Sequence, residues 1–272
     1  MEELIPNLIG DNINATLTML PSHDEIKNAV FSLYKDGAPG PDGFGPFFFQ
    51  TYWKIIHKEV TDTVLQFFQS GWIMPSYNAN ALILIPKGPN SELVEQYRPI
   101  AMVNFKFKVI SKILAYRLAQ ILPSIISKNQ KGFIQGRNIK DCICLASEAI
   151  NLMHKKSFAG NIALKIDIHK AFDTLNWNFL LKVLSCFGFN KTFVNWIATI
   201  LSSATLSISI NSAQHGYFAC TRVLRTKSLF DVLKITNIQY LFNLLSTNEF
   251  CEKCFIRMFL TKERRFFAHK TS

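Results

Sequence analysis

The stretch Lys165-Ile166-Asp167-Ile168-His169-Lys170-Ala171-Phe172-Asp173 carries more information about the fold than any other part of the chain. Its first residues continue an alternating apolar pattern that starts at Ile162, which is typical of a β-strand with one buried face. Asp167 falls on the opposite face, at the end of that strand, where a carboxylate contributes little to packing. Such a position suits a metal ligand or a side chain that caps the following turn. The spacing alone favours the cap.

Four further motifs precede this stretch. They are Ala38-Pro39-Gly40-Pro41-Asp42-Gly43-Phe44, Leu84-Ile85-Pro86-Lys87, Tyr97-Arg98-Pro99-Ile100 and Lys131-Gly132-Phe133-Ile134-Gln135-Gly136-Arg137. In this order, and followed by the Asp167 stretch, they resemble the reverse transcriptases of LINE-type (non-LTR) retrotransposons, most closely those of plants. The resemblance covers roughly residues 5–222. It implies an α+β fold, a partial right-hand polymerase made of the fingers and part of the palm.

The resemblance divides the chain into three parts. Residues 1–21 are expected to form an irregular lead-in connector, residues 22–218 the fingers and partial palm, and residues 219–272 a divergent basic tail. Periodicity and capping signals predict the elements of the middle part. We expect helices over 23–33, 46–70, 105–123, 139–154, 176–187 and 191–201, buried strands over 81–85 and 162–166, a strand over 206–210, a loop over 37–45 and a hairpin turn over 211–216.

The resemblance assigns chemistry to the end of the strand. Nucleotidyl transfer uses two divalent cations, and hard cations prefer carboxylate oxygens. Asp167 would be the first catalytic carboxylate and a ligand of Mg²⁺ or Mn²⁺, with the backbone carbonyl of Ile168 as a second contact. Phe172 would lie beneath the sugar of the incoming nucleotide and select against a 2′-hydroxyl. From the residues alone, a core phenylalanine on the first turn after the strand is an equal alternative for Phe172.

Four basic residues complete the site that the resemblance implies. Lys87 and Arg98 would grip the triphosphate, because a point charge and a forked donor both suit phosphate oxygens. Lys131 and Arg137 would contact the template backbone, an interaction that depends on salt rather than on sequence. The alternatives are two solvated surface cations for the first pair and an ordinary surface loop for the second.

The sequence departs from the family after Phe218. The family continues with an Arg-Gln-Gly-Asp-Pro-like motif and later an aromatic-Ala-Asp-Asp hairpin that supplies the other metal carboxylates. This chain instead reads Cys220-Thr221-Arg222-Val223-Leu224-Arg225, and it contains no Asp-Asp pair. We therefore expect a fragment of an RNA-directed DNA polymerase that is inactive alone. The alternative is a non-catalytic remnant that binds nucleic acid. By resemblance its partners are an RNA template, a DNA primer and deoxynucleotide triphosphates.

Composition sets wider bounds on the function. Hydrophobic residues make up 49% of the 272 residues, which favours a packed core over disorder. The net charge of +11 favours a polyanionic partner, but the last 51 residues contribute +6 of it. Scattered cysteines without a signal peptide predict an intracellular location, nucleus or cytoplasm. No apolar run approaches the ~18 residues that a membrane span needs.

Overall fold

The structure, a computed structural model, describes residues 5–128, 130–132, 134–155, 175–211 and 213–220, and the backbone of 161–164 and 268–271. Its helices are α1 (Asp11–Thr18), α2 (His23–Phe31), α3 (Pro46–Thr51), α4 (Trp53–Ser70), α5 (Phe105–Ile125), α6 (Ile139–Asn151), α7 (Trp177–Cys186) and α8 (Lys191–Ser202), with short 3-10 turns η1 (Pro75–Asn78) and η2 (Val94–Gln96). Its strands are β1 (Ala79–Pro86), β2 (Tyr97–Val103), β3 (Asn161–Leu164), β4 (Thr205–Ile210), β5 (Ala213–Ala219) and β6 (Ala268–Thr271). None of the helices in the described ranges is long and apolar enough to cross a membrane.

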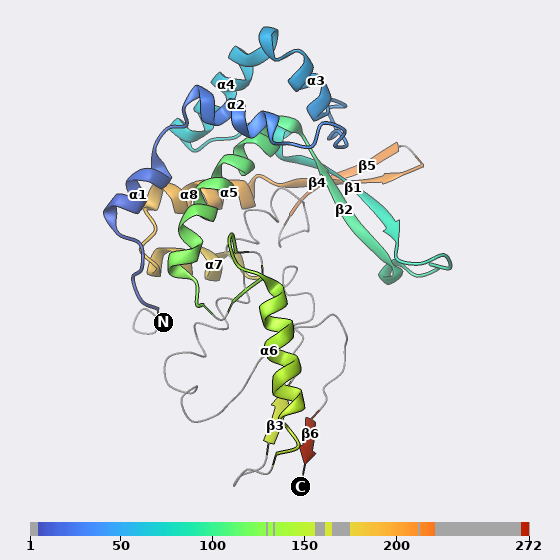
Figure 1. Cartoon of the computed structure of the whole chain (residues 1–272). Coiled ribbons are helices and arrows are strands. Elements are labelled where there is room, and N and C mark those ends of the chain that lie inside the picture. Colours follow the sequence, from blue (N-terminus) through green and yellow to red (C-terminus); the bar gives the residue numbers. More distant parts are fainter. Residues whose placement is uncertain are drawn as a thin grey trace.

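Helix α5 is the centre of the hydrophobic core (Figure 1). Its buried side chains, from Phe105 to Leu122, are mostly one or two residues apart, so they lie on more than one face of the helix and require neighbours on several sides. Helices α1, α2 and α4 pack against it. Phe105, at its first position, stacks on Phe49 of α3 with ring centroids 3.8 Å apart. The predicted helix over 105–123 is confirmed, and it continues through Pro123 to Ile125.

The expected irregular lead-in before residue 22 is wrong, because α1 is a helix that joins the core. Leu17 is 1% exposed. The amide of Asn14 donates to the carbonyl of Gly188 at 2.7 Å and accepts from the backbone N–H of Asn190 at 2.8 Å. These bonds attach α1 to the turn between α7 and α8. Helix α1 is therefore an integral part of the folded unit.

The predicted capping signals for the next helices are confirmed. The hydroxyl of Ser22 accepts from the backbone N–H of Glu25 at 3.1 Å and caps α2. The helix expected over 46–70 is interrupted at Tyr52, which separates α3 from α4. Helix α4 ends at Gly71 as expected, because Gly71 adopts a φ of +69°, which residues other than glycine rarely adopt.

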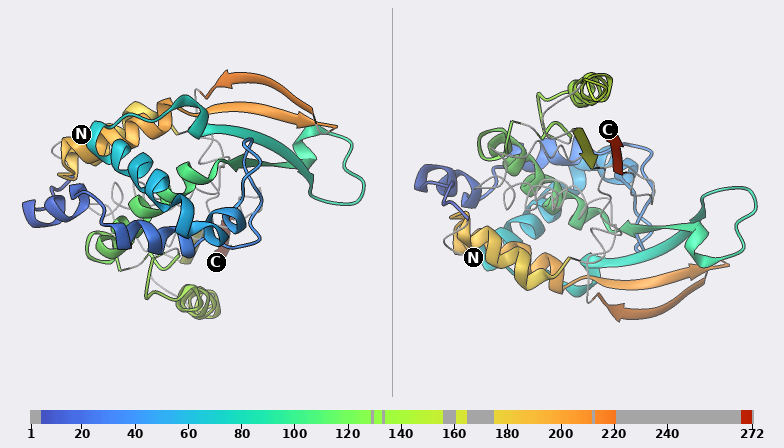
Figure 2. Two further views of the ribbon diagram at one scale, coloured as in Figure 1. Left: turned by 90° about the horizontal axis from the view of Figure 1, so that it is seen from above. Right: turned by 90° about the horizontal axis from the view of Figure 1, so that it is seen from below.

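Four strands form a mixed sheet with the order β2-β1-β4-β5. Strand β1 pairs antiparallel with β2 and parallel with β4, and β4 pairs antiparallel with β5. The sheet extends away from the helices as a twisted wing (Figures 1 and 2). The strand over 81–85 was predicted to be buried, and only its inner end is. Ala81 is buried, whereas Ile83, Leu84 and Ile85 are exposed because they lie on the projecting part of the wing.

A second, two-stranded sheet pairs β3 with β6 in antiparallel register, with Asn161 opposite Thr271. The strand expected before Asp167 is confirmed over Asn161–Leu164. The pairing with β6 was not expected, since the tail shows no clear alternating pattern. Asp167, Ile168 and Phe172 lie outside the described residues, as does most of the tail after residue 220.

Candidate functional site

The register of the β1–β2 hairpin brings two of the predicted phosphate-binding cations to one face. Ile85 lies directly opposite Arg98, so their side chains leave the sheet on the same side. Lys87 follows Ile85 by two residues, and its backbone N–H continues the ladder by donating to the carbonyl of Gln96 at 2.8 Å. Lys87 and Arg98 are therefore diagonal neighbours on one face.

The two cations differ in their present partners. Both residues are exposed. The ammonium group of Lys87 donates to the backbone carbonyl of Glu95 at 2.5 Å. The guanidinium of Arg98 makes no hydrogen bond or ion pair with any part of the chain that the structure describes. Arg98 can therefore meet an anion as it stands, whereas Lys87 must first release the Glu95 carbonyl.

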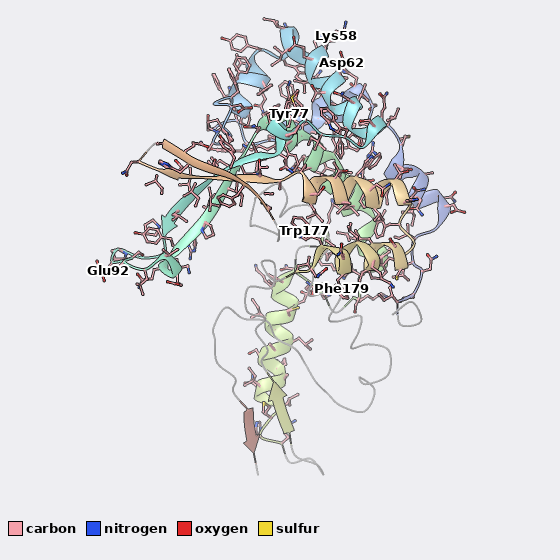
Figure 3. The ribbon with its side chains drawn as sticks, turned by 180° about the vertical axis from the view of Figure 1, so that it is seen from behind. Lys58, Asp62, Tyr77, Glu92, Trp177 and Phe179 are labelled. Carbon is pink, nitrogen blue, oxygen red and sulfur yellow. The ribbon has the colours of Figure 1, made fainter. Side chains whose placement is uncertain are left out.

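The loop at the end of this hairpin is held by its own hydrogen bonds. The hydroxyl of Tyr97 donates to the carbonyl of Ser91 at 2.9 Å, and the side-chain oxygen of Gln96 accepts from the backbone N–H groups of Glu92 and Leu93. Figure 3 shows Glu92 at the far end of the wing. These bonds give Lys87 and Arg98 an ordered local frame.

The second pair of predicted cations borders a cavity of about 540 Å³ at the start of α6. The cavity is lined by Lys131, Gly132, Gly136, Arg137, Asn138 and Ile139. Asn138 caps α6 by accepting from the backbone N–H of Lys140 at 2.9 Å. Lys131 lies 3.5 Å from the carboxylate of Asp141; the Lys131 side chain is half-buried and that of Asp141 is exposed. A helix N-terminus and an ammonium group both favour a nearby anion.

Arg137 has a structural role that its motif does not reveal. Its two terminal nitrogens donate to four backbone carbonyls at the end of α5 and in the following turn. The acceptors are Pro123, Ile126, Ser127 and Gln130. Arginine has five N–H donors, so only the one on Nε is left for any other group. Arg137 therefore fixes the wall of the cavity, whereas Lys131 is paired with the exposed carboxylate of Asp141 and can exchange it for another anion.

The predicted metal ligands cannot be placed in this geometry, since Asp167 and Ile168 fall outside the described residues, together with Phe172. Within the described ranges, no three His, Cys, Asp or Glu side chains form a cluster suited to a metal ion. The assignment of Mg²⁺ or Mn²⁺ to Asp167 therefore rests on the sequence motif alone.

Asn104 is a buried polar residue next to the hairpin that sequence reasoning missed. It follows β2 directly, and its side chain hydrogen-bonds to the loop before α3 and to η1. Its position directly before a predicted helix was the available signal, but that position suggests only a helix cap. The structure shows no side-chain cap bond from Asn104.

Comparison with known proteins gives one family match. The sequence profile of the family described as "Reverse transcriptase (RNA-dependent DNA polymerase)" matches residues 85–226, more than half of the chain. The matched segment begins within β1 and includes Arg98, the cavity at the start of α6 and the Asp167 stretch.

Three similar proteins come from transposable elements of animals. The chain is 26% identical over 188 residues to the "Transposon TX1 uncharacterized 149 kDa protein" of Xenopus laevis, which covers 69% of the chain and 14% of that protein. It is 24% identical to the "Retrovirus-related Pol polyprotein from type-1 retrotransposable element R2" of Popillia japonica, over 74% of the chain and 27% of that polyprotein. It is 26% identical to the "Retrovirus-related Pol polyprotein from type-1 retrotransposable element R1" of Bradysia coprophila, over 64% of the chain and 18% of that polyprotein. The chain thus spans about a quarter or less of the length of these relatives.

Proposed function

Because this chain belongs to the reverse transcriptase (RNA-dependent DNA polymerase) family, we propose that it forms the fingers and part of the palm of a LINE-type (non-LTR) retrotransposon polymerase. The observation that carries the proposal is the placement of Lys87 and Arg98 on one face of the β1–β2 hairpin. A phosphate chain presents several anionic oxygens along a line, and two neighbouring cations on a rigid hairpin match that arrangement.

In this proposal Lys87 and Arg98 bind the triphosphate of the incoming deoxynucleotide. Arg98 offers a planar fork of N–H donors with no partner in the described structure, so binding does not require it to leave another group. Lys87 exchanges the carbonyl of Glu95 for a phosphate oxygen. A charge-assisted hydrogen bond contributes about 1.5–3 kcal/mol, so losing either side chain should weaken binding by at least about tenfold.

Equilibrium binding of a deoxynucleotide triphosphate, measured by calorimetry with and without Mg²⁺, tests this role. Arg98→Met and Lys87→Met remove one charge each and keep an unbranched side chain. Lys54→Met is the matched control, because Lys54 is an exposed cation on α4 rather than on the hairpin. We expect the first two variants to bind the deoxynucleotide triphosphate more weakly than the wild type, and the control to bind it with the wild-type affinity. Equal affinities for all four proteins would contradict the proposal.

The template strand is proposed to pass the cavity at the start of α6, with Lys131 in contact with backbone phosphates and Arg137 holding the cavity wall. One lost phosphate contact lowers the slope of log affinity against log salt by about 0.7 for a single strand. Lys131→Ala should therefore reduce the slope for single-stranded RNA by about that amount, and Lys54→Ala should leave it unchanged. An unchanged slope for Lys131→Ala would remove Lys131 from the template path.

The chemical centre is proposed from the sequence. Asp167 and the carbonyl of Ile168 would hold Mg²⁺ or Mn²⁺, which supplies charge stabilisation at the transferred phosphoryl group. Phe172 would exclude a 2′-hydroxyl. After Asp173 the acids are Asp231, Glu249, Glu252 and Glu263, without an Asp-Asp pair. We therefore propose that residues 1–272 alone lack the carboxylates for a second metal position and do not catalyse DNA synthesis.

A non-catalytic nucleic-acid-binding role is the second candidate, and the same missing carboxylates favour it. In that case the chain binds RNA or DNA through Lys131 with a measurable salt slope, and deoxynucleotide triphosphates bind weakly or not at all. The calorimetric and salt-dependence measurements distinguish the two functions, since only the polymerase proposal requires nucleotide affinity that depends on Arg98.

A further inference from the structure

Asn104 connects three separate segments at the base of the β1–β2 hairpin. Its side-chain oxygen accepts from the backbone N–H of Asp42 at 3.1 Å. Its side-chain nitrogen donates to the carbonyl of Ser76 at 2.7 Å. Asn104 itself follows the last residue of β2 and is 6% exposed. The loop of residues 37–45, η1 and the end of β2 therefore share one buried amide.

The loop of residues 37–45 lies so close to Asn104 that its residue 40 has to be a glycine. A Cβ on Gly40 would lie 2.5 Å from the backbone nitrogen of Asn104 and 2.6 Å from its Cα. These are backbone atoms, so no side-chain rotation could relieve the contact. The ammonium group of Lys108 also donates to the carbonyl of Ala38 at 2.8 Å. The loop is thus fixed to the first turn of α5 from two sides.

The contact of Asn104 with the loop of residues 37–45 and with η1, here called the joint, lies where it can affect the position of the distant end of the hairpin. Strand β1 starts directly after η1, and β2 ends directly before Asn104, so both strands leave the core here. In Figure 3, Tyr77 of η1 marks this base of the hairpin and Glu92 marks its far end. Arg98 lies six residues from Asn104 along β2, which corresponds to about 20 Å of strand. A rotation of about 5° at the base would move a group at that distance by about 2 Å.

We propose that Asn104 is a positioning residue that sets the angle of the β1–β2 hairpin relative to the helical core, with the loop of residues 37–45 as its support. The inference rests on the proposed function, because it concerns the placement of Lys87 and Arg98 on the triphosphate. A shift of about 2 Å carries a donor beyond hydrogen-bond distance of a phosphate oxygen, and a lost charge-assisted bond corresponds to about tenfold in affinity. Asn104 itself lies at the opposite end of the hairpin and acts only through the strands.

Three variants and one matched control test the inference. Asn104→Ala removes both hydrogen bonds, and Gly40→Ala forces the loop away from Asn104. The double variant shows whether the two act through one joint. The control is Asn14→Ala, because Asn14 also makes one donor and one acceptor bond to backbone groups, at the turn between α7 and α8. Deoxynucleotide affinity is measured by calorimetry at least 15 °C below each protein's melting temperature, and amide hydrogen exchange is followed over residues 79–103.

We expect Asn104→Ala and Gly40→Ala each to weaken deoxynucleotide binding about tenfold, and the double variant to be no weaker than the worse single variant. Asn14→Ala should lose thermal stability while keeping the wild-type affinity. If the wild type binds and Asn104→Ala binds as tightly as Asn14→Ala, the positioning role is overturned, whatever the exchange data show.

If the wild type binds no deoxynucleotide, the proposed function fails and hydrogen exchange decides the inference separately. Faster exchange over residues 79–103 in Asn104→Ala than in Asn14→Ala would support the joint. Equal exchange in the two variants would overturn it.

Discussion

Replacing Arg117 by methionine tests how the N-terminal helices are held to the core. Arg117 lies on α5 and is 6% exposed. Its Nε and one terminal nitrogen donate to the two carboxylate oxygens of Glu25 on α2, each at 2.8 Å. Its other terminal nitrogen donates to the carbonyls of Leu17 and Met19, at the end of α1 and just after it. Arg117→Met keeps much of the volume and removes all four bonds.

The expected loss follows from what the methionine leaves behind. Removing one partner of a buried ion pair costs about 3–5 kcal/mol, because the other charge remains buried without compensation. The side chain of Glu25 is 29% exposed, so water recovers part of its solvation. We therefore expect a loss at the low end, about 3 kcal/mol. For a folded unit of roughly 200 residues this corresponds to about 6–12 °C in melting temperature.

Thermal unfolding followed by circular dichroism measures this change. Lys131→Met is the control, because the Lys131–Asp141 pair is longer, at 3.5 Å, and Asp141 is 59% exposed, so the pair should contribute less than about 1 kcal/mol. Glu25→Gln in the Arg117→Met background should recover part of the loss by removing the unpaired carboxylate. An Arg117→Met protein that melts within 2 °C of the Lys131→Met control would refute this account of the core.

Two further predictions concern a glycine pair and a thiol. Gly188 and Gly136 have φ values of +91° and +77°, so alanine costs about 1 kcal/mol at each. A Cβ at Gly188 would also lie 3.0 Å from the backbone carbonyl oxygen of Ile9, besides displacing the side chain of Asn7, whereas Gly136 faces open space. Denaturant midpoints should therefore fall further for Gly188→Ala, and equal midpoints would contradict the close approach. Burial raises the pKa of the Cys220 thiol from 9.0 to about 11, so at pH 8 its thiolate fraction is about a hundredfold below that of an ordinary thiol. Iodoacetamide labelling followed by mass spectrometry should show correspondingly slow modification that rises up to about pH 11, and labelling at the rate of free cysteine would contradict this.

Helices that carry their own start and stop signals could be predicted from the sequence. Ser22, Asn176 and Asn190 each accept a backbone N–H at a helix start, as their side chains allow. Gly71 ends α4 because the chain there needs a positive φ. Such signals act within four residues, so one sequence contains all the information they require.

Features that depend on distant partners could not be predicted in this way. Helix α1 has eight residues, too few for stability alone, and Asn14 secures it through a turn 174 residues away. The exposure of Ile83 and Ile85 depends on how far the sheet projects from the helices. Arg137 was assigned to the template by its motif, yet four backbone carbonyls occupy its terminal nitrogens. In each case the deciding neighbour comes from another part of the fold.

Primer extension by the purified chain is the measurement that tests the central claim most directly. The claim is that residues 1–272 bind a deoxynucleotide triphosphate through Lys87 and Arg98 but lack the carboxylates for DNA synthesis. With an RNA template, a DNA primer and Mg²⁺ or Mn²⁺, extension should not exceed that of a buffer control, while a complete reverse transcriptase extends the same primer. Reproducible incorporation that Asp167→Ala abolishes would contradict the account, and would require a second metal ligand among the acids after Asp173.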